Sequence, residues 1–335
     1  MCGDTGLASS DKQVPSMEKT NVCVVGVGNL GQHHARIYSQ MENVCLAGCA
    51  DTDSKKLSKV CSSYKTQGYT DYTQLLDKVD AVSVVVPTTM HFRVARDFLL
   101  NGVHCFVEKP LTTSVQEAEE LISLAEKKNL ILQVGHIERF NAAILSVRDY
   151  IKEPKFIEAS RLGPYDPRVS DVGVVLDLMI HDLDIVLYLV NSKVTDIESY
   201  GTSIFSSHED IVKVRLKFEN GCIVDLSASR ATFGKYRKLR IFQPSAYISI
   251  DYSSQRFRVY RKKTENVQSM KDIEIISPRL AKVEPLRKEL EHFIECSREG
   301  KTPMVSGEHG RDALELALEI LKKLTKTPAS NLAQI

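Results

Sequence analysis

The run Val22-Cys-Val-Val-Gly-Val-Gly-Asn-Leu-Gly31 decides the fold. A short apolar stretch leads directly into the glycine pattern GxGxxG, and a helical pattern follows at once. The first glycine permits a tight turn, the second lets the backbone approach a pyrophosphate, and the third lets the helix pack on the strand. The positive end of that helix faces the anion. The turn therefore predicts a dinucleotide site whose contacts are Gly26, Gly28, Asn29, Leu30 and Gly31.

An acidic residue follows the next apolar run, residues 44–50. Asp51 stands about 20 residues beyond the glycine turn, where the acid that binds the adenosine ribose is expected. A carboxylate there accepts hydrogen bonds from the ribose diol and repels a 2′-phosphate, which favours NAD over NADP. Lys55 and Lys56 follow closely and leave NADP open as the alternative.

Apolar runs alternate with helical patterns between residues 21 and 135. The apolar runs are 22–25, 44–50, 81–86, 103–107 and 130–134, and the helical patterns are 32–40, 55–61, 72–76, 91–100 and 115–128. Continuous apolar strands separated by helices predict a parallel sheet covered on both faces. The fold class is therefore α/β, with an NAD-binding Rossmann domain over 21–135 after a disordered leader, 1–20.

The strand patterns of residues 136–325 follow each other more closely. Strands are predicted at 156–161, 194–201, 210–218, 222–229, 239–243, 247–251 and 256–261, and helices at 140–152, 173–190, 285–298 and 308–323. Asn220-Gly221 predicts a hairpin turn. We expect an α+β domain with a mostly antiparallel open sheet, serving substrate binding and oligomerisation, and then a tail, 326–335. An open sheet needs a covered face, which favours a homodimer or homotetramer.

Composition limits the class of protein. A length of 335 residues suits two domains of roughly 150 residues each. The balance of 44 Lys+Arg against 43 Asp+Glu argues against nucleic-acid and membrane-surface partners. No apolar run reaches the ~20 residues that span a bilayer. The eight cysteines form no CxxC pair, which argues against a metal or disulfide framework and favours a reducing cytoplasm.

Two segments carry candidate catalytic side chains. Lys109 follows the strand pattern 103–107, at the edge where open α/β sheets bind ligands. A single lysine is more often a surface charge. The apolar helix 173–190, however, carries Asp177, His181 and Asp184 at spacings of four and three, which places them on one face. Such a stripe lines a cleft, or it forms a satisfied core network or a domain interface.

Together these segments resemble the Gfo/Idh/MocA oxidoreductases over residues 21–325. The likeness rests on the glycine turn with His34, on 87–91, on Glu108-Lys109-Pro110, on 177–181 and on 284–293. It implies a Rossmann domain, a C-terminal domain with an open sheet, and hydride transfer between NAD(P) and a sugar or polyol hydroxyl. The residues that it implies for catalysis are Lys109, Asp177 and His181, and those for the cofactor include Pro87, Thr88, His91, Glu108, Lys109 and Gln133.

Each catalytic role follows from side-chain chemistry. His181, with an ordinary pKa near ~6.5, is suited to act as general base. Lys109 is suited to stabilise the developing alkoxide. Asp177 is expected to orient the imidazole or the hydroxyl.

The substrate side is less constrained. Residues 133–141 resemble a run in bacterial nucleotide-sugar members, especially UDP-N-acetylglucosamine 3-dehydrogenase-like proteins. Capping and interdomain hydrogen bonds are the alternative for its polar side chains. The glycine and prolines of the loop 161–168 make it rigid enough to present Tyr165 and Arg168 to a ligand. A solvated loop is the alternative for either of its arginines. The basic run 235–240 is expected to be an exposed strand face, with a phosphate role as the alternative. The candidate substrate contacts are Arg139, Asn141, Arg161, Tyr165, Arg168 and Asp184.

The resemblance thus implies an NAD-dependent dehydrogenase that oxidises C3 of UDP-N-acetylglucosamine to the 3-keto sugar, and the composition predicts that it is cytoplasmic. Its product would supply an aminotransferase in cell-envelope glycan or lipid A synthesis. An inositol or free-sugar dehydrogenase is the alternative within the family. A non-catalytic NAD-binding sensor or regulator is the alternative of another class. That alternative predicts the loss of Lys109, Asp177 or His181, and all three are present.

Overall fold

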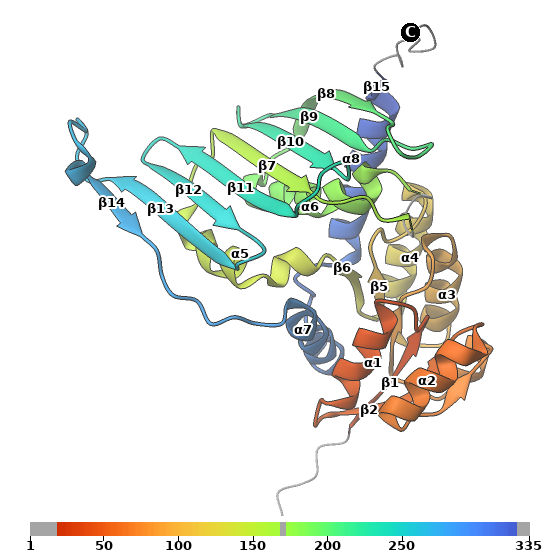
Figure 1. Cartoon of the computed structure of the whole chain (residues 1–335). Coiled ribbons are helices and arrows are strands. Elements are labelled where there is room, and N and C mark those ends of the chain that lie inside the picture. Colours follow the sequence, from red (N-terminus) through yellow and green to blue (C-terminus); the bar gives the residue numbers. More distant parts are fainter. Residues whose placement is uncertain (1–18, 168–171, 327–335) are drawn as a thin grey trace, which may run out of the picture.

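Two sheets organise the chain in the computed structural model, which describes residues 19–167 and 172–326 (Figure 1). The first sheet has six strands in the order β3-β2-β1-β4-β5-β6, all paired in parallel. The second has nine strands in the order β14-β13-β12-β11-β7-β10-β9-β8-β15. Its pairs are antiparallel except β7 with β10 and β8 with β15. This arrangement confirms the predicted fold class.

The first sheet and its helices follow the predicted alternation closely. Strand β3 is the addition: two residues are too few to show a periodic pattern. The elements are β1 Thr20–Val25, α1 Gly31–Ser39, β2 Val44–Ala50, α2 Ser54–Tyr64, β3 Gly68–Tyr69, η1 Tyr72–Leu75, β4 Ala81–Val84, α3 Thr88–Leu100, β5 His104–Glu108, α4 Val115–Lys128 and β6 Leu132–Gly135.

The second half differs from prediction in four places. The predicted helix 140–152 is divided into short turns, the predicted helix 173–190 begins with a π turn, and β14 and β15 were not predicted. The elements are η2 Ile137–Phe140, α5 Ala142–Val147, η3 Arg148–Tyr150, β7 Phe156–Leu162, the π turn η5 Val175–Met179, α6 Ile180–Val190, β8 Val194–Thr202, β9 Ile211–Phe218, β10 Ile223–Ser229, β11 Tyr236–Gln243, β12 Ala246–Asp251, β13 Arg256–Lys262, η6 Met270–Asp272, β14 Ile273–Ile276, α7 Pro285–Glu299, α8 Gly307–Lys323 and β15 Thr325–Lys326.

Helices cover both faces of the first sheet, and one of them comes from the far end of the chain. Val22 and Val24 pack in a cluster with α1, α2 and α7, whereas Cys23 and Val25 pack with α3 and α4. The Phe293 ring of α7 lies 5.8 Å from the Phe106 ring of β5. In Figure 1, α7 lies beside α1. The first sheet therefore completes its core with a helix that follows residue 135, and the domain limits stay a prediction.

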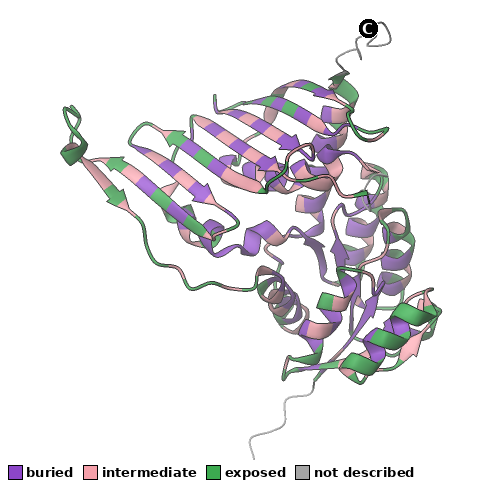
Figure 2. Cartoon of the chain, viewed as in Figure 1, coloured by how far each residue is buried: buried purple, intermediate pink, exposed green. Residues whose placement is uncertain are grey.

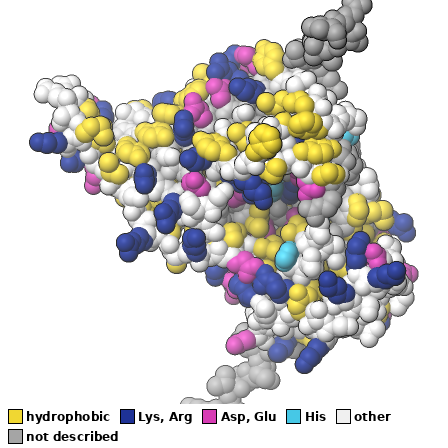
Figure 3. All heavy atoms as spheres, in the orientation of Figure 1, with side chains coloured by type: hydrophobic (Ala, Val, Ile, Leu, Met, Phe, Trp, Pro, Cys, Tyr) yellow, Lys and Arg dark blue, Asp and Glu magenta, His cyan; other side chains and the backbone are white. Residues whose placement is uncertain are grey.

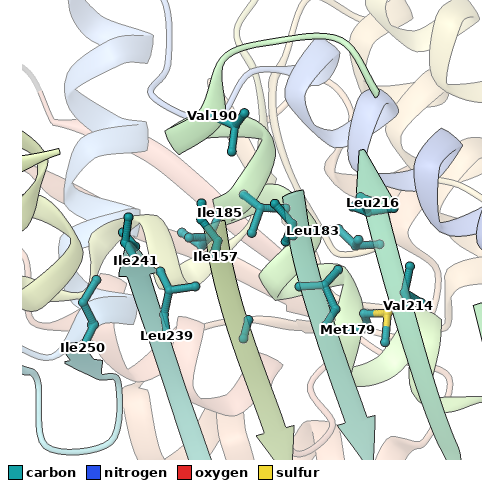
Figure 4. Packing of buried hydrophobic residues seen from close by; sticks show 14 of the residues in the cluster. Ile157, Met179, Leu183, Ile185, Val190, Val214, Leu216, Leu239, Ile241 and Ile250 are labelled. Carbon is teal, nitrogen blue, oxygen red and sulfur yellow. The ribbon is translucent and has the colours of Figure 1, made fainter. Parts of the chain in front are cut away.

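The second sheet is covered on one face only. Along β9, Val212, Val214 and Leu216 are buried while Lys213 and Arg215 are exposed. The buried side packs on α6 and α8, and Figure 4 shows Met179 and neighbouring side chains against the strands. Figure 2 shows buried and exposed bands alternating along the strands. The Asn220-Gly221 hairpin joins β9 to β10, with Gly221 at φ +80°. The oligomeric state stays a prediction.

Among the described helices, none combines the length and apolar character that a bilayer span requires.

Candidate active site

The glycine turn joins β1 to α1. Gly26 has φ +91°, and a Cβ there would lie 2.4 Å from the Val85 carbonyl oxygen. A Cβ on Gly31 would lie 1.8 Å from the Gly26 carbonyl oxygen. A Cβ on Gly28, in contrast, would meet nothing within 4 Å. Backbone packing therefore requires the first and third glycines, whereas the second leaves the open space above the turn that a pyrophosphate needs.

Asp51 directly follows β2 and is held beside this turn. Its Oδ2 accepts a hydrogen bond from the Val27 amide at 2.8 Å, and its Oδ1 accepts one from the Asp53 amide at 2.8 Å. Each carboxylate oxygen retains a lone pair for a ribose hydroxyl. Asn29 and Leu30 complete the turn before α1 begins. These residues fit the adenosine half of NAD.

Other predicted cofactor residues divide into two groups. Pro87 caps α3, which begins at Thr88 a few residues after β4, and Glu108 ends β5 at the same edge of the sheet. Buried His91 holds two backbone segments together, with its ring nitrogens 2.9 Å from the Pro110 carbonyl and 2.8 Å from the Val86 carbonyl. Gln133 is fully buried in β6, where its Nε2 donates to the Glu289 carbonyl at 3.1 Å. Both ring nitrogens of His91 therefore lie against backbone carbonyls, whereas Gln133 Oε1 is buried and has no hydrogen-bond partner among the described residues.

Glu108 faces inward rather than toward a ligand. Its Oε1 lies 3.2 Å from Nε2 of the buried His34, which joins the end of β5 to α1. Its Oε2 accepts a hydrogen bond from the Lys109 amide at 3.2 Å. The carboxylate therefore sets the backbone that carries Lys109.

Lys109 joins the first sheet to the second half of the chain. Its Nζ donates to the Asp177 carbonyl at 2.7 Å and lies 3.4 Å from Asp177 Oδ1. The two side chains are 18% and 24% exposed, so both remain accessible to a ligand. Asp177 lies in the π turn, a local distortion that is frequent at functional sites. The structure thus brings together two of the three residues predicted for catalysis.

His181 lies in the first turn of α6, one turn after Asp177. Its Nδ1 is buried and has no hydrogen-bond partner among the described residues. Burial holds the pKa of this imidazole well below its ordinary value, and the charges of Lys109 and Arg161 add to the effect. A neutral ring at neutral pH retains a nitrogen that can accept a proton.

A second imidazole stands beside it. The His136 ring lies 6.4 Å from the His181 ring, at 90° to it. Both His136 nitrogens are buried without partners in the described part of the chain, and burial lowers its pKa. Sequence analysis assigned His136 no role, although it lies in the run 133–141. Its position directly after β6 was the available signal.

Two predicted substrate contacts instead form a buried ion pair. Arg139 Nε and Nη2 donate to the two Asp184 carboxylate oxygens, each at 2.7 Å. Both side chains are 1% exposed. The guanidinium also lies 4.1 Å from the centre of the Tyr188 ring. The prediction that Arg139 and Asp184 face the substrate does not agree with this geometry, because the two side chains form an ion pair inside the protein. Arg139 Nη1 is also buried and has no hydrogen-bond partner among the described residues.

Arg161 and Asn141 are also used internally. Arg161 is buried and donates to Asp182 Oδ2 at 2.8 Å and to Glu138 Oε1 at 2.8 Å. Asn141 accepts a hydrogen bond from the Ala143 amide at 3.1 Å, which caps α5, and its Nδ2 donates to Glu138. Asn141 therefore follows the capping alternative, and Arg161, for which a solvated loop was the alternative, is paired inside the protein. The helix pattern did not reveal Asp182 as a partner of Arg161.

The loop after β7 presents one predicted contact. Tyr165 is partly exposed, with its ring 5.5 Å from the Phe205 ring and 5.6 Å from the Arg230 guanidinium carbon. Arg168 lies outside the described residues.

Arg237, from the basic run, was not among the predicted site residues. Arg237 pairs with Arg161 across β11 and β7, so both side chains point to the same, covered face of the sheet. Arg240, three residues on, is exposed. The basic run is therefore not a uniform exposed face. Arg237 shares its face with the buried Leu239 and Ile241, and that two-residue alternation was the signal in the sequence.

Comparison with known proteins identifies the family. Residues 20–136 match the model of an oxidoreductase family with an NAD-binding Rossmann fold, GFO_IDH_MocA, and residues 135–263 match the C-terminal domain of the same family. The chain belongs to the Gfo/Idh/MocA oxidoreductases. It is an enzyme of this NAD-binding family, as its motifs predicted.

Related proteins cover nearly the whole chain. A UDP-N-acetylglucosamine 3-dehydrogenase of Acidithiobacillus ferrooxidans is 34% identical over 89% of this chain and 95% of its own length. A solved structure of the enzyme of that name and organism superimposes with a TM-score of 0.87 at 33% identity, over 92% of this chain and 98% of that one. The scyllo-inositol 2-dehydrogenase (NAD(+)) of Bacillus subtilis is 26% identical over 84% of this chain and 87% of its own length.

Proposed function

We propose that this Gfo/Idh/MocA oxidoreductase oxidises the C3 hydroxyl of UDP-N-acetylglucosamine to the 3-keto sugar. One observation carries the reaction type: Lys109, at the carboxyl edge of β5, is held by Asp177, and the partly buried His181 lies one turn after Asp177. The relative that is 34% identical over 89% of the chain supports the choice of substrate. The proposed product would then be consumed by an amino-group transfer to the new ketone.

The catalytic roles follow from the protonation of these side chains. NAD, when bound by the glycine turn and Asp51, supplies the hydride acceptor. His181 takes the hydroxyl proton because its low pKa keeps the ring neutral. Lys109 donates a hydrogen bond to the same oxygen and stabilises the developing negative charge. Asp177 positions the Lys109 ammonium through its carbonyl and its carboxylate.

A substrate panel tests the proposal. Purified enzyme is mixed with NAD and, separately, UDP-N-acetylglucosamine, free N-acetylglucosamine, myo-inositol and scyllo-inositol, and reduced nicotinamide is followed by absorbance. We expect kcat/KM to be highest for UDP-N-acetylglucosamine, with the His181→Asn variant as the blank. Turnover of an inositol without turnover of the UDP-sugar would overturn the proposal. NAD binding without turnover of any of the four would favour a regulator.

A further inference from the structure

The arginines Arg139, Arg161 and Arg237 lie on the substrate side, and one of them has no ion-pair partner in the described part of the chain. Arg139 is taken by Asp184, and Arg161 is shared by Asp182 and Glu138. The Arg237 guanidinium makes no hydrogen bond or ion pair with any residue in 19–167 or 172–326, and the residue is half-buried. A guanidinium that is partly removed from water without an acceptor is unfavourable, because its N–H groups lose hydration and gain nothing in return.

Arg237 lies where it can reach a ligand of the proposed site. Its cross-strand partner is Arg161, whose side chain extends toward α6 and η2 on the covered face of the sheet. Both its neighbours on this face, Leu239 and Ile241, are buried, whereas Arg237 remains partly open. Figure 3 shows a hollow between the two halves of the molecule, bordered by Lys and Arg side chains and by Asp and Glu side chains.

Arg237 also interacts electrostatically with the proposed catalytic groups. Burial and the neighbouring Arg161 charge lower the pKa of Arg237, while Glu138, Asp182 and Asp177 act in the opposite direction. In turn, Arg237 is one of the cations that lower the pKa of His181. Its charge is therefore felt at the same helix, η5 with α6, that carries the residues proposed for proton transfer.

We propose that Arg237 binds the sugar-linked phosphate of a nucleotide-sugar substrate. The planar guanidinium fork matches two phosphate oxygens, and a charged acceptor supplies the hydrogen bonds that the protein does not. The phosphate is attached to C1, only two carbons from C3, so one sugar ring spans from the phosphate to the reacting carbon. This inference rests on the proposed function, and it makes Arg237 the residue that separates nucleotide sugars from neutral polyols.

Calorimetric titration with two probes tests the subsite without requiring turnover. UDP and uridine are titrated separately into NAD-loaded wild-type enzyme, Arg237→Gln, Arg237→Lys and Lys238→Gln. Lys238 is the matched control, because it is the next residue along β11 and points to the opposite face. We expect Arg237→Gln to weaken UDP binding by about 10-fold or more, the range for a lost charged hydrogen bond. Uridine binding should be unchanged, and Arg237→Lys should be intermediate.

The outcomes separate the two proposals. Equal UDP affinity of wild type and Arg237→Gln, or no UDP binding by wild type, overturns the phosphate subsite and shows that Arg237 serves only to balance Asp182 and Glu138. If Arg237→Gln oxidises UDP-N-acetylglucosamine with an unchanged KM, the phosphate subsite is likewise overturned, but the proposed function stands. Arg237-dependent UDP binding without oxidation of the UDP-sugar supports the subsite and overturns the proposed reaction. If Arg237→Gln fails to fold, the ratio of UDP to uridine affinity is compared between Arg237→Lys and wild type. A lower ratio in Arg237→Lys supports the phosphate subsite, and an equal ratio overturns it.

Discussion

The cofactor turn and the substrate side are built on different principles. The turn is determined by backbone packing. A Cβ on Gly31 would collide with the Gly26 carbonyl oxygen, and a Cβ on Gly26 would collide with the Val85 carbonyl oxygen, so both positions require glycine. On the substrate side the side chains do the work, and partners such as Arg161 and Asp182 come from different elements. The difference teaches that a motif reveals a binding role where the contact is local, whereas an arginine shows its role only when its partner is known.

Removal of the proposed catalytic groups has the largest expected effect. Lys109→Met and His181→Asn should each lower kcat about 10²- to 10⁴-fold, because each removes a proton-transfer or charge-stabilising group. The NAD affinity of His181→Asn, measured by calorimetry, should stay near the wild-type value. Lys213→Met, on the exposed face of β9, is the matched control and should retain full activity. Near-normal turnover in either active-site variant would contradict the assigned roles.

Breaking a buried ion pair tests whether the substrate-side arginines are structural. Asp184→Ala leaves the Arg139 charge buried and should lower the free energy of unfolding by about 3–5 kcal/mol. Asp225→Ala breaks an exposed pair, Arg215 with Asp225, whose side chains are 49% and 32% exposed. That control should cost no more than about 1 kcal/mol. Urea denaturation measures both, and equal losses would show that Arg139 is not held as described.

Two alanine substitutions sharpen the comparison within the turn. Gly31→Ala forces a Cβ into the Gly26 carbonyl oxygen and should lower the free energy of unfolding by ~1–3 kcal/mol. Gly28→Ala meets no protein atom, so its melting temperature should match wild type while NAD binding weakens about tenfold, or ~1.4 kcal/mol. Thermal unfolding and calorimetry separate the two effects. A Gly28→Ala variant with normal NAD affinity would argue against a close backbone approach.

The pH dependence is the smallest expected effect. The native pKa of His181 is lowered, so kcat/KM should fall only as the pH drops below the ordinary histidine value near ~6.5. In that window the unfolded chain binds a proton that the native state does not, so stability also falls as the pH falls. His181→Asn should lose part of this dependence in urea denaturation between pH 7 and 5. An acid limb above pH 7 would contradict a lowered pKa.

Prediction from sequence succeeded where the pattern is local. The apolar run 44–50 corresponds to β2, and the pattern 115–128 corresponds to α4. It failed at 140–152, where Asn141 caps a short helix and the chain changes direction again at η3. The sequence pattern also did not show that α7 packs against the first sheet. An amphipathic pattern predicts that one face of a helix is buried, but it does not identify the element that covers this face.

The candidate site follows the same division. Lys109 and Asp177 were predicted from a strand end and a helix stripe, and the structure joins them directly. Arg139 was predicted as a ligand contact because arginine suits anions, yet it forms a buried ion pair with Asp184. Arg237 was assigned to an exposed run, although the strand alternation with Leu239 places it on the covered face. Only the tertiary pairing distinguishes a satisfied arginine from an available one.

Transfer of deuterium from C3 tests the central proposal most directly. UDP-N-acetylglucosamine labelled with deuterium at C3 is incubated with enzyme and NAD, and the reduced nicotinamide is analysed by mass spectrometry. The account predicts that the deuterium appears in the reduced nicotinamide and that the wild-type enzyme, but not His181→Asn, catalyses the transfer. Reduced nicotinamide that forms from this substrate without the label would contradict oxidation at C3.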